Sequence, residues 1–147
     1  MLQCLLAFLL AAAPVAAFPL QIDESDWPDS PPGRMARAYV IAFNAGEAEM
    51  MEFIRNPTGS SSESARKMRA EDEQKQLEFY RRKRKEYGDL EVLRIFRVEY
   101  QVVGLVCRGQ AGNLTTVEII AGPEPPQSLL TIRMQRIEGS DPYSFNP

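Results

Sequence analysis

The sequence predicts an α+β protein in which three N-terminal helices pack on a four-stranded antiparallel sheet. Apolar residues recur at helical spacing up to about residue 87, and they alternate with polar residues from about residue 90 onward. The chain has 147 residues, 44% of them hydrophobic and 25% charged. This length and composition fit one domain with a modest core, formed by helices that cover one face of a sheet.

The first seventeen residues are predicted to be a signal peptide. They carry no charged side chain and run from an apolar stretch through Pro14 to the small residues Ala16 and Ala17. That order is typical of a secretory signal cleaved after Ala17. An uncleaved membrane anchor is the alternative, because the apolar run approaches the roughly 18 residues that span a bilayer. We therefore expect an exported protein, periplasmic or secreted, that touches a membrane only through an uncleaved signal.

Residues 18–29 are expected to form an extended acidic leader, with four acidic and no basic side chains. Trp27 is the residue that would pin this leader to the domain. The first helix follows, because the Ser30 hydroxyl can cap free amides and Pro31 fits the first turn of a helix. Gly46 supplies the stop, since glycine accepts a left-handed conformation.

Two more helices are expected before the strands. The first covers residues 47–55, with Met50, Met51 and Ile54 on its buried side. The second covers residues 62–87, where 14 of the 21 residues from 66 to 86 are charged. Most of that helix must face water, so we expect it to pack along one narrow edge.

Four strands account for the rest of the domain, at residues 90–100, 101–108, 114–121 and 128–136. We assign residues 30–137 to the α+β domain and residues 138–147 to a C-terminal tail. Alternation in the first strand is expected to place these residues mostly on one face: Leu90, Val92, Phe96, Val98 and Tyr100.

The composition excludes several kinds of catalytic chemistry. The chain has no histidine, so it has no Ser-His-Asp or Cys-His nucleophile and lacks the commonest zinc ligand. The segment from Ser64 to Lys67 fits an S-x-x-K pattern, but the companion motifs of serine enzymes are missing. Cys107, the one cysteine left after signal cleavage, is expected to be a small buried hydrophobe. We expect no catalytic residue, no metal site and no cofactor.

One basic run and one modification motif are further candidates for a functional site. The run "RRKRK" can bind an anionic surface or, as solvated cations, stabilise the end of a helix; it comprises Arg81, Arg82, Lys83, Arg84 and Lys85. Asn113 begins a glycosylation sequon at a turn, which matters only in a eukaryotic host. The net charge of -3 argues against a nucleic-acid partner.

Polar and aromatic side chains in the strands and the first helix are the candidates for a ligand pocket between sheet and helices. Alternating charges of this kind also occur on the solvent face of an antiparallel sheet, so both interpretations stay open. The pocket candidates are Tyr39, Arg97, Glu99, Tyr100 and Glu118.

Three segments of the chain resemble parts of one known kind of module. The segment "PDSPPGRMARAYVIAFNAGE" at residues 28–47 is similar to its opening, and "GDLEVLRI" and "PEPPQSLLTIRM" are similar to later parts. On these segments the chain resembles a SnoaL-like module of exported bacterial proteins. The resemblance implies a curved sheet in a cone-like roll, of the kind found upstream of beta-lactamase-like serine hydrolases or tail-specific proteases. It carries over no catalytic residue, because the matching positions are caps, turns and core.

We therefore expect an exported, non-catalytic accessory domain that binds a partner protein or small ligand of the cell envelope in the cone between helices and sheet. A homodimer is compatible with these features. One alternative is a small-molecule enzyme of the cone fold with a carboxylate base of raised pKa. A second alternative is adhesion to an anionic surface through residues 81–85.

Overall fold

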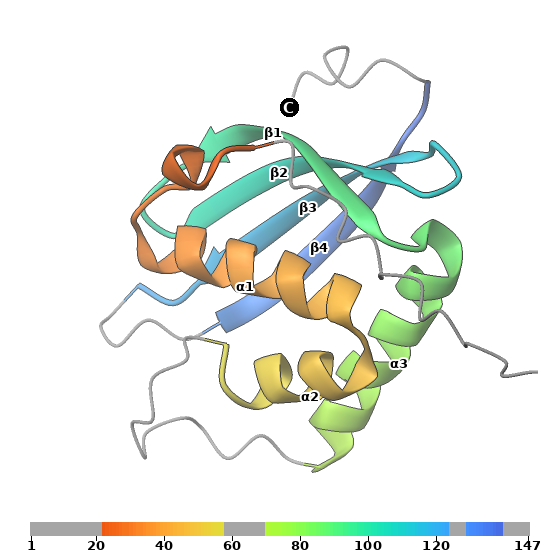
Figure 1. Ribbon diagram of the computed structural model, residues 1–147. Helices are drawn as coiled ribbons and strands as arrows, with labels where there is room; N and C mark the ends of the chain where they lie inside the picture. The colour runs from red at the N-terminus through yellow and green to blue at the C-terminus, as the bar shows by residue number, and fades with distance from the viewer. Residues whose placement is uncertain (1–21, 58–69, 124–128, 140–147) are drawn as a thin grey trace, which may run out of the picture.

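The helices come first in the chain and the strands follow, in a computed structural model that describes residues 22–57, 70–123 and 129–139 (Figure 1). A short 3₁₀ turn, η1, precedes the helices. In chain order the elements are η1 (Glu24–Asp26), α1 (Pro31–Ala45), α2 (Glu47–Arg55), α3 (Ala70–Tyr87), β1 (Leu90–Val98), β2 (Val102–Gly109), β3 (Leu114–Ala121) and β4 (Leu129–Ile137). This order confirms the predicted α+β class.

Local sequence signals fix the first two helices. The Ser30 hydroxyl accepts a hydrogen bond from the Gly33 amide at 3.2 Å, and prolines occupy the first turn of α1. Gly46 adopts a φ of 137°, which is open to glycine but strained for other residues. That residue ends α1 and begins α2, so the chain turns sharply between the two helices.

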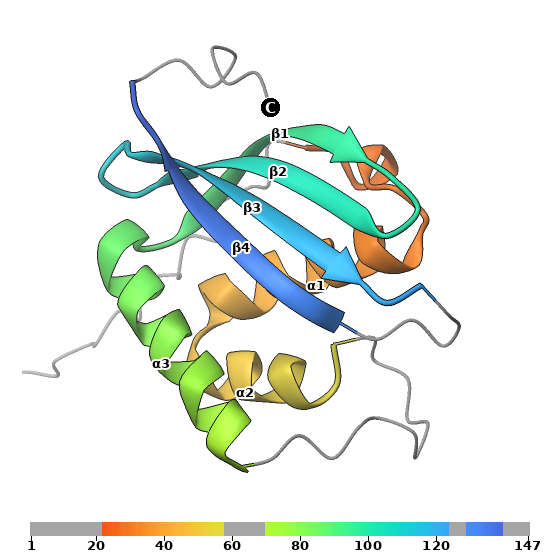
Figure 2. The ribbon, with the colours of Figure 1, turned by 180° about the vertical axis from the view of Figure 1, so that it is seen from behind.

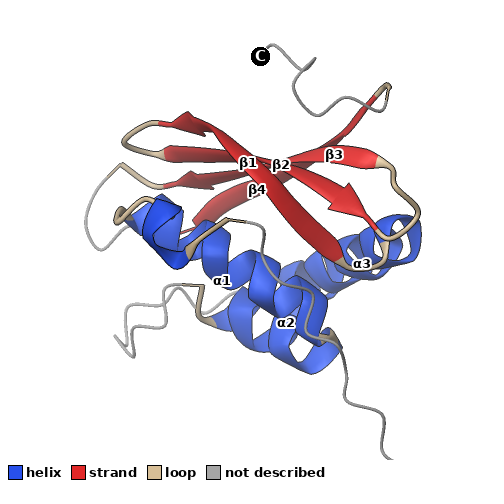
Figure 3. Cartoon of the chain, turned by 45° about the horizontal axis from the view of Figure 1, so that its top comes forward, coloured by secondary structure: helices blue, strands red, loops and turns tan. Residues whose placement is uncertain are grey.

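The strands form an open antiparallel meander in the order β1-β2-β3-β4. Among the described elements, α1, α2 and α3 all lie on one side of the twisted sheet (Figure 3). Helix α1 contacts the sheet through β1, β2 and β3, while α2 packs on α1 and α3. Figure 2 shows α3 next to α2 on the helix side of the sheet.

The main core lies between α1 and the sheet. Its aromatic residues contact one another, with ring centroids 5.7 Å apart for Tyr39 and Phe43 and 5.3 Å apart for Phe43 and Tyr80. Full burial of each aliphatic side chain contributes about 1.5–3 kcal/mol. The core includes Val40, Met50, Ile54, Leu90, Val92, Val103, Leu105, Cys107, Val117 and Ile119. The expectation that Cys107 is a buried hydrophobe is confirmed.

The predicted alternation in β1 is wrong, because two irregularities break the register of this strand, between Val92 and Arg94 and again between Ile95 and Arg97. Each bulge inserts an extra residue and shifts the side-chain phase. Ile95 therefore packs against the helix-side core, while Phe96 joins a second cluster on the opposite face. That second cluster contains Leu93, Phe96, Val106, Leu114 and Ile137.

The leader is attached to the domain in its described part. Trp27 is only 8% exposed and belongs to the main core, and η1 forms a turn directly before it. The predicted signal peptide at residues 1–17, the start of the third helix at residues 62–69 and the tail from residue 140 lie outside the described residues. Along the described ranges, none of the helices is both long and apolar enough to cross a bilayer.

Candidate functional site

A pocket of about 200 Å³ opens between α2, α3 and the start of β4. Helix α2 contributes Met50 and Ile54, and β4 contributes Leu129 and Ile132. The remaining lining residues are Tyr39, Lys75, Gln76, Phe79, Tyr80, Leu130 and Thr131. The wall is therefore mainly apolar and aromatic, with a few polar groups, as is usual for sites that bind an apolar group.

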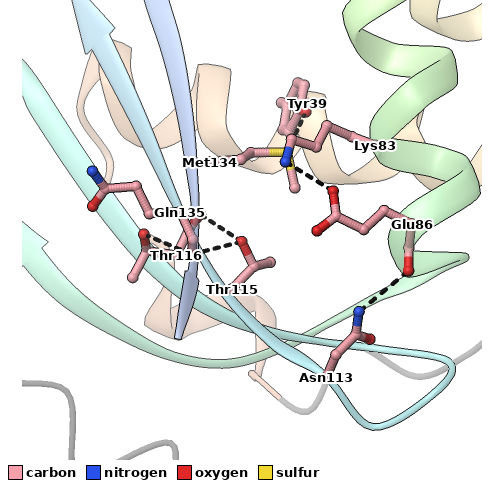
Figure 4. Close-up of polar contacts among 8 residues, drawn as sticks. All are labelled: Tyr39, Lys83, Glu86, Asn113, Thr115, Thr116, Met134 and Gln135. Atoms are coloured by element: carbon pink, nitrogen blue, oxygen red, sulfur yellow. Dashed lines mark hydrogen bonds and ion pairs between the residues drawn. The ribbon is translucent and has the colours of Figure 1, made fainter. Parts of the chain in front are cut away.

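Tyr39 of α1 is a buried lining residue of the pocket. Its hydroxyl donates a hydrogen bond to the Met134 sulfur at 3.4 Å, as Figure 4 shows. Burial raises the pKa of Tyr39 far above its ordinary value of 10.0, with smaller contributions from Cys107 and Tyr80. The phenol therefore stays neutral and protonated, and it acts here as a hydrogen-bond donor.

The mouth of the pocket combines exposed apolar and polar side chains. Leu130 is 55% exposed and lies at the start of β4, next to Thr131. Across the opening, α3 presents Lys75 and Gln76 together with the partly buried Phe79. Such a mouth suits an occupant with an apolar part inside the pocket and a polar part in water.

The other predicted pocket residues do not join Tyr39. Arg97 reaches from β1 across Gly104 of β2 and donates to Glu118 of β3 at 3.2 Å and to Glu99 at 2.8 Å. In the β2–β3 register Glu118 alternates with Val117 and Ile119, which belong to the helix-side core. The two carboxylates and Arg97 therefore lie on the sheet face opposite the helices, away from the pocket.

The contacts of Arg97 with the two carboxylates concern the alternative function, an enzyme that uses a carboxylate as a general base. A general base of this kind needs a raised pKa, which requires desolvation. The hydrogen bond from Arg97 instead lowers the pKa of Glu99. Tyr100, also predicted for the pocket, is 68% exposed and donates a hydrogen bond to the Pro123 carbonyl at 3.3 Å. The geometry around Glu99 therefore gives that alternative no support.

The basic run at the end of α3 is engaged largely within the protein. Arg81 donates to Glu47 of α2 at 2.8 Å, and this hydrogen bond lowers the pKa of Glu47. Lys83 bonds to Glu86 at 2.9 Å, and Arg84 forms an ion pair with Asp89.

The other two cations of the run differ. The Arg82 guanidinium lies 5.5 Å from the centre of the Phe79 ring, and Lys85 is exposed. Three of the five cations therefore have acidic partners in the fold, which fits the interpretation as a stabilised helix end, and adhesion to an anionic surface through this run stays a prediction.

Asn113 has a structural role at the turn between β2 and β3. Its side-chain nitrogen donates to the Glu86 carbonyl at 3.2 Å, so the side chain ties the turn to the end of α3 (Figure 4). This nitrogen is the atom to which a glycan would be joined. Thr115, the third residue of the sequon, is fully buried and donates from its hydroxyl to the Gln135 carbonyl at 2.9 Å.

Several pocket residues were not identified from the sequence as site residues. Phe79 lies in the most charged part of the chain, and Leu129 and Leu130 read as ordinary strand residues. The sequence did carry one signal. Neighbouring residues of a strand point to opposite faces of the sheet, so only one of the two consecutive leucines can point into a core on one face. The structure shows Leu130 to be the more exposed of the two.

Fold and site together define an α+β protein with an apolar pocket beside an edge strand. Within the described ranges, no three carboxylate or thiol side chains lie close enough together to hold a metal ion. No protein-family model, curated protein or solved structure matched this chain. The resemblance to a SnoaL-like module therefore stays a prediction.

Proposed function

We propose that this chain is an exported, non-catalytic accessory domain that binds an apolar group of a partner protein or small ligand in the pocket between α2, α3 and β4. The observation that carries the proposal is the lining of that pocket. Export rests on the signal-like character of residues 1–17.

The size and polarity of the pocket support binding. A cavity of about 200 Å³ accepts a group the size of a large apolar side chain. If such a group loses about 150 Å² of exposed apolar surface, the gain is about 4 kcal/mol at ~25 cal/mol per Å². Part of that gain is lost to the entropy of association, so we expect weak to moderate affinity unless further contacts form.

The ionisable groups of the pocket support a non-catalytic role. Burial raises the pKa of both Tyr39 and Tyr80, and the Tyr80 hydroxyl donates to the Phe43 carbonyl at 3.5 Å. Both phenols are protonated and their hydroxyls are engaged in internal hydrogen bonds, so neither is set up to take a proton from an occupant.

The test is binding of an uncharged apolar fluorophore, N-phenyl-1-naphthylamine, to the full chain. We expect Leu130→Trp to weaken binding at least tenfold, because the indole fills the mouth of the pocket. Leu130 is mostly exposed, so the substitution leaves the core intact.

Ile41→Trp is the matched control, since Ile41 is a 51% exposed aliphatic residue of α1 and does not line the pocket. We expect this variant to bind within twofold of the wild type. Equal affinity of the Leu130→Trp variant and the wild type would show that the fluorophore binds elsewhere and would reject the pocket as the site.

A further inference from the structure

The edge of β4 that faces away from β3 lies next to the pocket. In the described part of the chain β4 pairs only with β3, and their register is unbroken from Thr131 to Ile137. The opposite side of such a strand presents backbone N–H and C=O groups without strand partners, and these can pair with an added extended segment. Because Leu129 to Ile132 also line the pocket, a segment added here would pass directly over it.

The two rows of side chains on β4 differ in polarity. Leu129, Ile132 and Met134 pack toward the helix-side core. Arg133 and Gln135 alternate with them, are exposed and point to the opposite face. A neighbouring strand continues both rows, so its side chains on the helix side would meet α3 and the pocket. The edge therefore suits a segment that is apolar on one side and polar on the other.

The charge of β4 indicates which charge the polar side of that segment should carry. The strand carries Arg133 and Arg136 and no acidic residue. Its cross-strand neighbour Glu118 is engaged by Arg97 at 3.2 Å. Within the described residues, Arg133 has no carboxylate at ion-pair distance. An acidic side chain opposite Arg133 on an added strand would form the cross-strand pair that β3 does not supply.

The same charge disfavours a second copy of this chain as the occupant. In the fully overlapping antiparallel register of two β4 strands, Arg133 of one copy lies opposite Arg133 of the other. Like charges directly opposite each other across strands are destabilising.

We propose that an extended segment of a partner protein, apolar on one side and acidic on the other, adds to β4 as a fifth strand and places one apolar side chain in the pocket. This inference rests on the proposed function, because it uses the same pocket. The backbone pairing supplies affinity, while the pocket and Arg133 select the sequence.

The test uses a labelled synthetic heptapeptide of alternating glutamate and valine, with fluorescence anisotropy on the full chain. We expect binding, and we expect at least tenfold weaker binding when alternate backbone amides of the peptide are N-methylated. A peptide with lysine in place of glutamate should bind at least tenfold more weakly than the acidic one. In the variant Arg133→Glu this preference should reverse.

Arg34→Glu is the control, since Arg34 is an exposed arginine of α1 that does not line the pocket, and the preference for the acidic peptide should persist there. In one outcome the peptide fails to bind while N-phenyl-1-naphthylamine still binds and Leu130→Trp still blocks the fluorophore. That result would overturn strand addition and leave the pocket function intact. Failure of both would overturn both. Sedimentation showing a dimer that Arg133→Glu alters would identify a second copy as the occupant and overturn the proposal.

Discussion

The two edges of the sheet are built differently. The β1 edge is closed by its own irregularities and by a side chain from α1, whereas β4 is regular from Thr131 to Ile137 and lies beside the pocket. Edge strands invite unwanted pairing, and proteins protect them with bulges and covering groups. Among the described residues, the bulges and the covering side chain are at the β1 edge, and this difference supports the proposal that a partner segment adds to β4.

Asn44 covers the start of the β1 edge. Its side-chain nitrogen donates to the Leu90 carbonyl at 2.8 Å, and its side-chain oxygen accepts from the Leu90 amide at 2.8 Å. The amide side chain thus satisfies both polar groups of Leu90, as a neighbouring strand would. Because Leu90 is fully buried, water cannot replace these two bonds readily.

The largest effect is expected for Asn44→Ala, which opens the closed edge. The substitution leaves a buried donor and a buried acceptor of Leu90 without partners, at a cost of about 1–3 kcal/mol for each group. We expect the free energy of unfolding to fall by about 2–4 kcal/mol in urea denaturation.

Asn56→Ala is the control for this prediction. Asn44 lies in the last turn of α1, and Asn56 lies directly after the last residue of α2, but the side-chain oxygen of Asn56 has no hydrogen-bond partner among the described residues. We expect a change below about 1 kcal/mol. A similar loss of stability in the two variants would show that Asn44 contributes only through its position at a helix end. Its bonds to Leu90 would then not stabilise the β1 edge.

A smaller effect is expected where β1 packs over β2. Gly104 lies under the Phe96 ring, and a Cβ at this position would come within 2.6 Å of the ring. Phe96 is partly buried and packs against the second cluster with Val106 and Leu114, so moving the ring away from a new methyl group costs some of those contacts. We expect Gly104→Ala to lower the free energy of unfolding by about 1–3 kcal/mol.

In a variant that already carries Phe96→Ala, Gly104→Ala is expected to change stability in the opposite direction. With the ring removed, alanine is the better strand residue by roughly 0.5–1 kcal/mol, and Gly104→Ala should become neutral or stabilising. Urea denaturation of the four proteins of this cycle measures the coupling. Additive effects would show that the ring and the glycine are independent and that β1 is not fitted to β2 at this point.

The sequence predicted the helices and strands well, but it did not predict which side chains of β1 point to which face of the sheet. The Ser30 cap, the Gly46 stop and the change to strand spacing after residue 88 each act locally, so they are readable from neighbouring residues. The bulges of β1 depend on the register with β2 and on the Gly104 gap under Phe96. That information lies in a different strand, so the alternation of β1 alone led to the wrong faces.

The candidate site was less predictable, because it is assembled from distant parts of the chain. Tyr39 was identified, but Met50, Phe79 and Leu130 come from α2, α3 and β4, which meet around the pocket only in the folded chain. The polar residues Arg97, Glu99 and Glu118 were grouped by type in the sequence. The structure does group them, but on the sheet face opposite the pocket, where they satisfy one another.

The smallest effect is expected at the ion pair between Arg97 and Glu99, at the end of β1 near the closed edge. Arg97 lowers the pKa of Glu99 below its ordinary value of 4.5 through a hydrogen bond. A carboxyl group with a lowered pKa in the fold contributes stability that is present above its unfolded pKa and is lost as pH falls through the folded pKa. The stability difference between the wild type and Arg97→Gln should therefore shrink from pH 6 toward pH 3.

Carboxyl NMR titration measures the same interaction at Glu99 directly. We expect Arg97→Gln to raise the titration midpoint of Glu99 toward its ordinary value, since the hydrogen bond that favours the ionised form is lost. Arg133→Gln on the open edge should leave that midpoint unchanged, because Arg133 is not among the groups that shift the pKa of Glu99. If both substitutions raised the Glu99 midpoint equally, the pKa shift would reflect the general positive charge of this sheet face. Arg97 would then not be paired with Glu99 more closely than Arg133 is, and the contrast between the two edges would not hold.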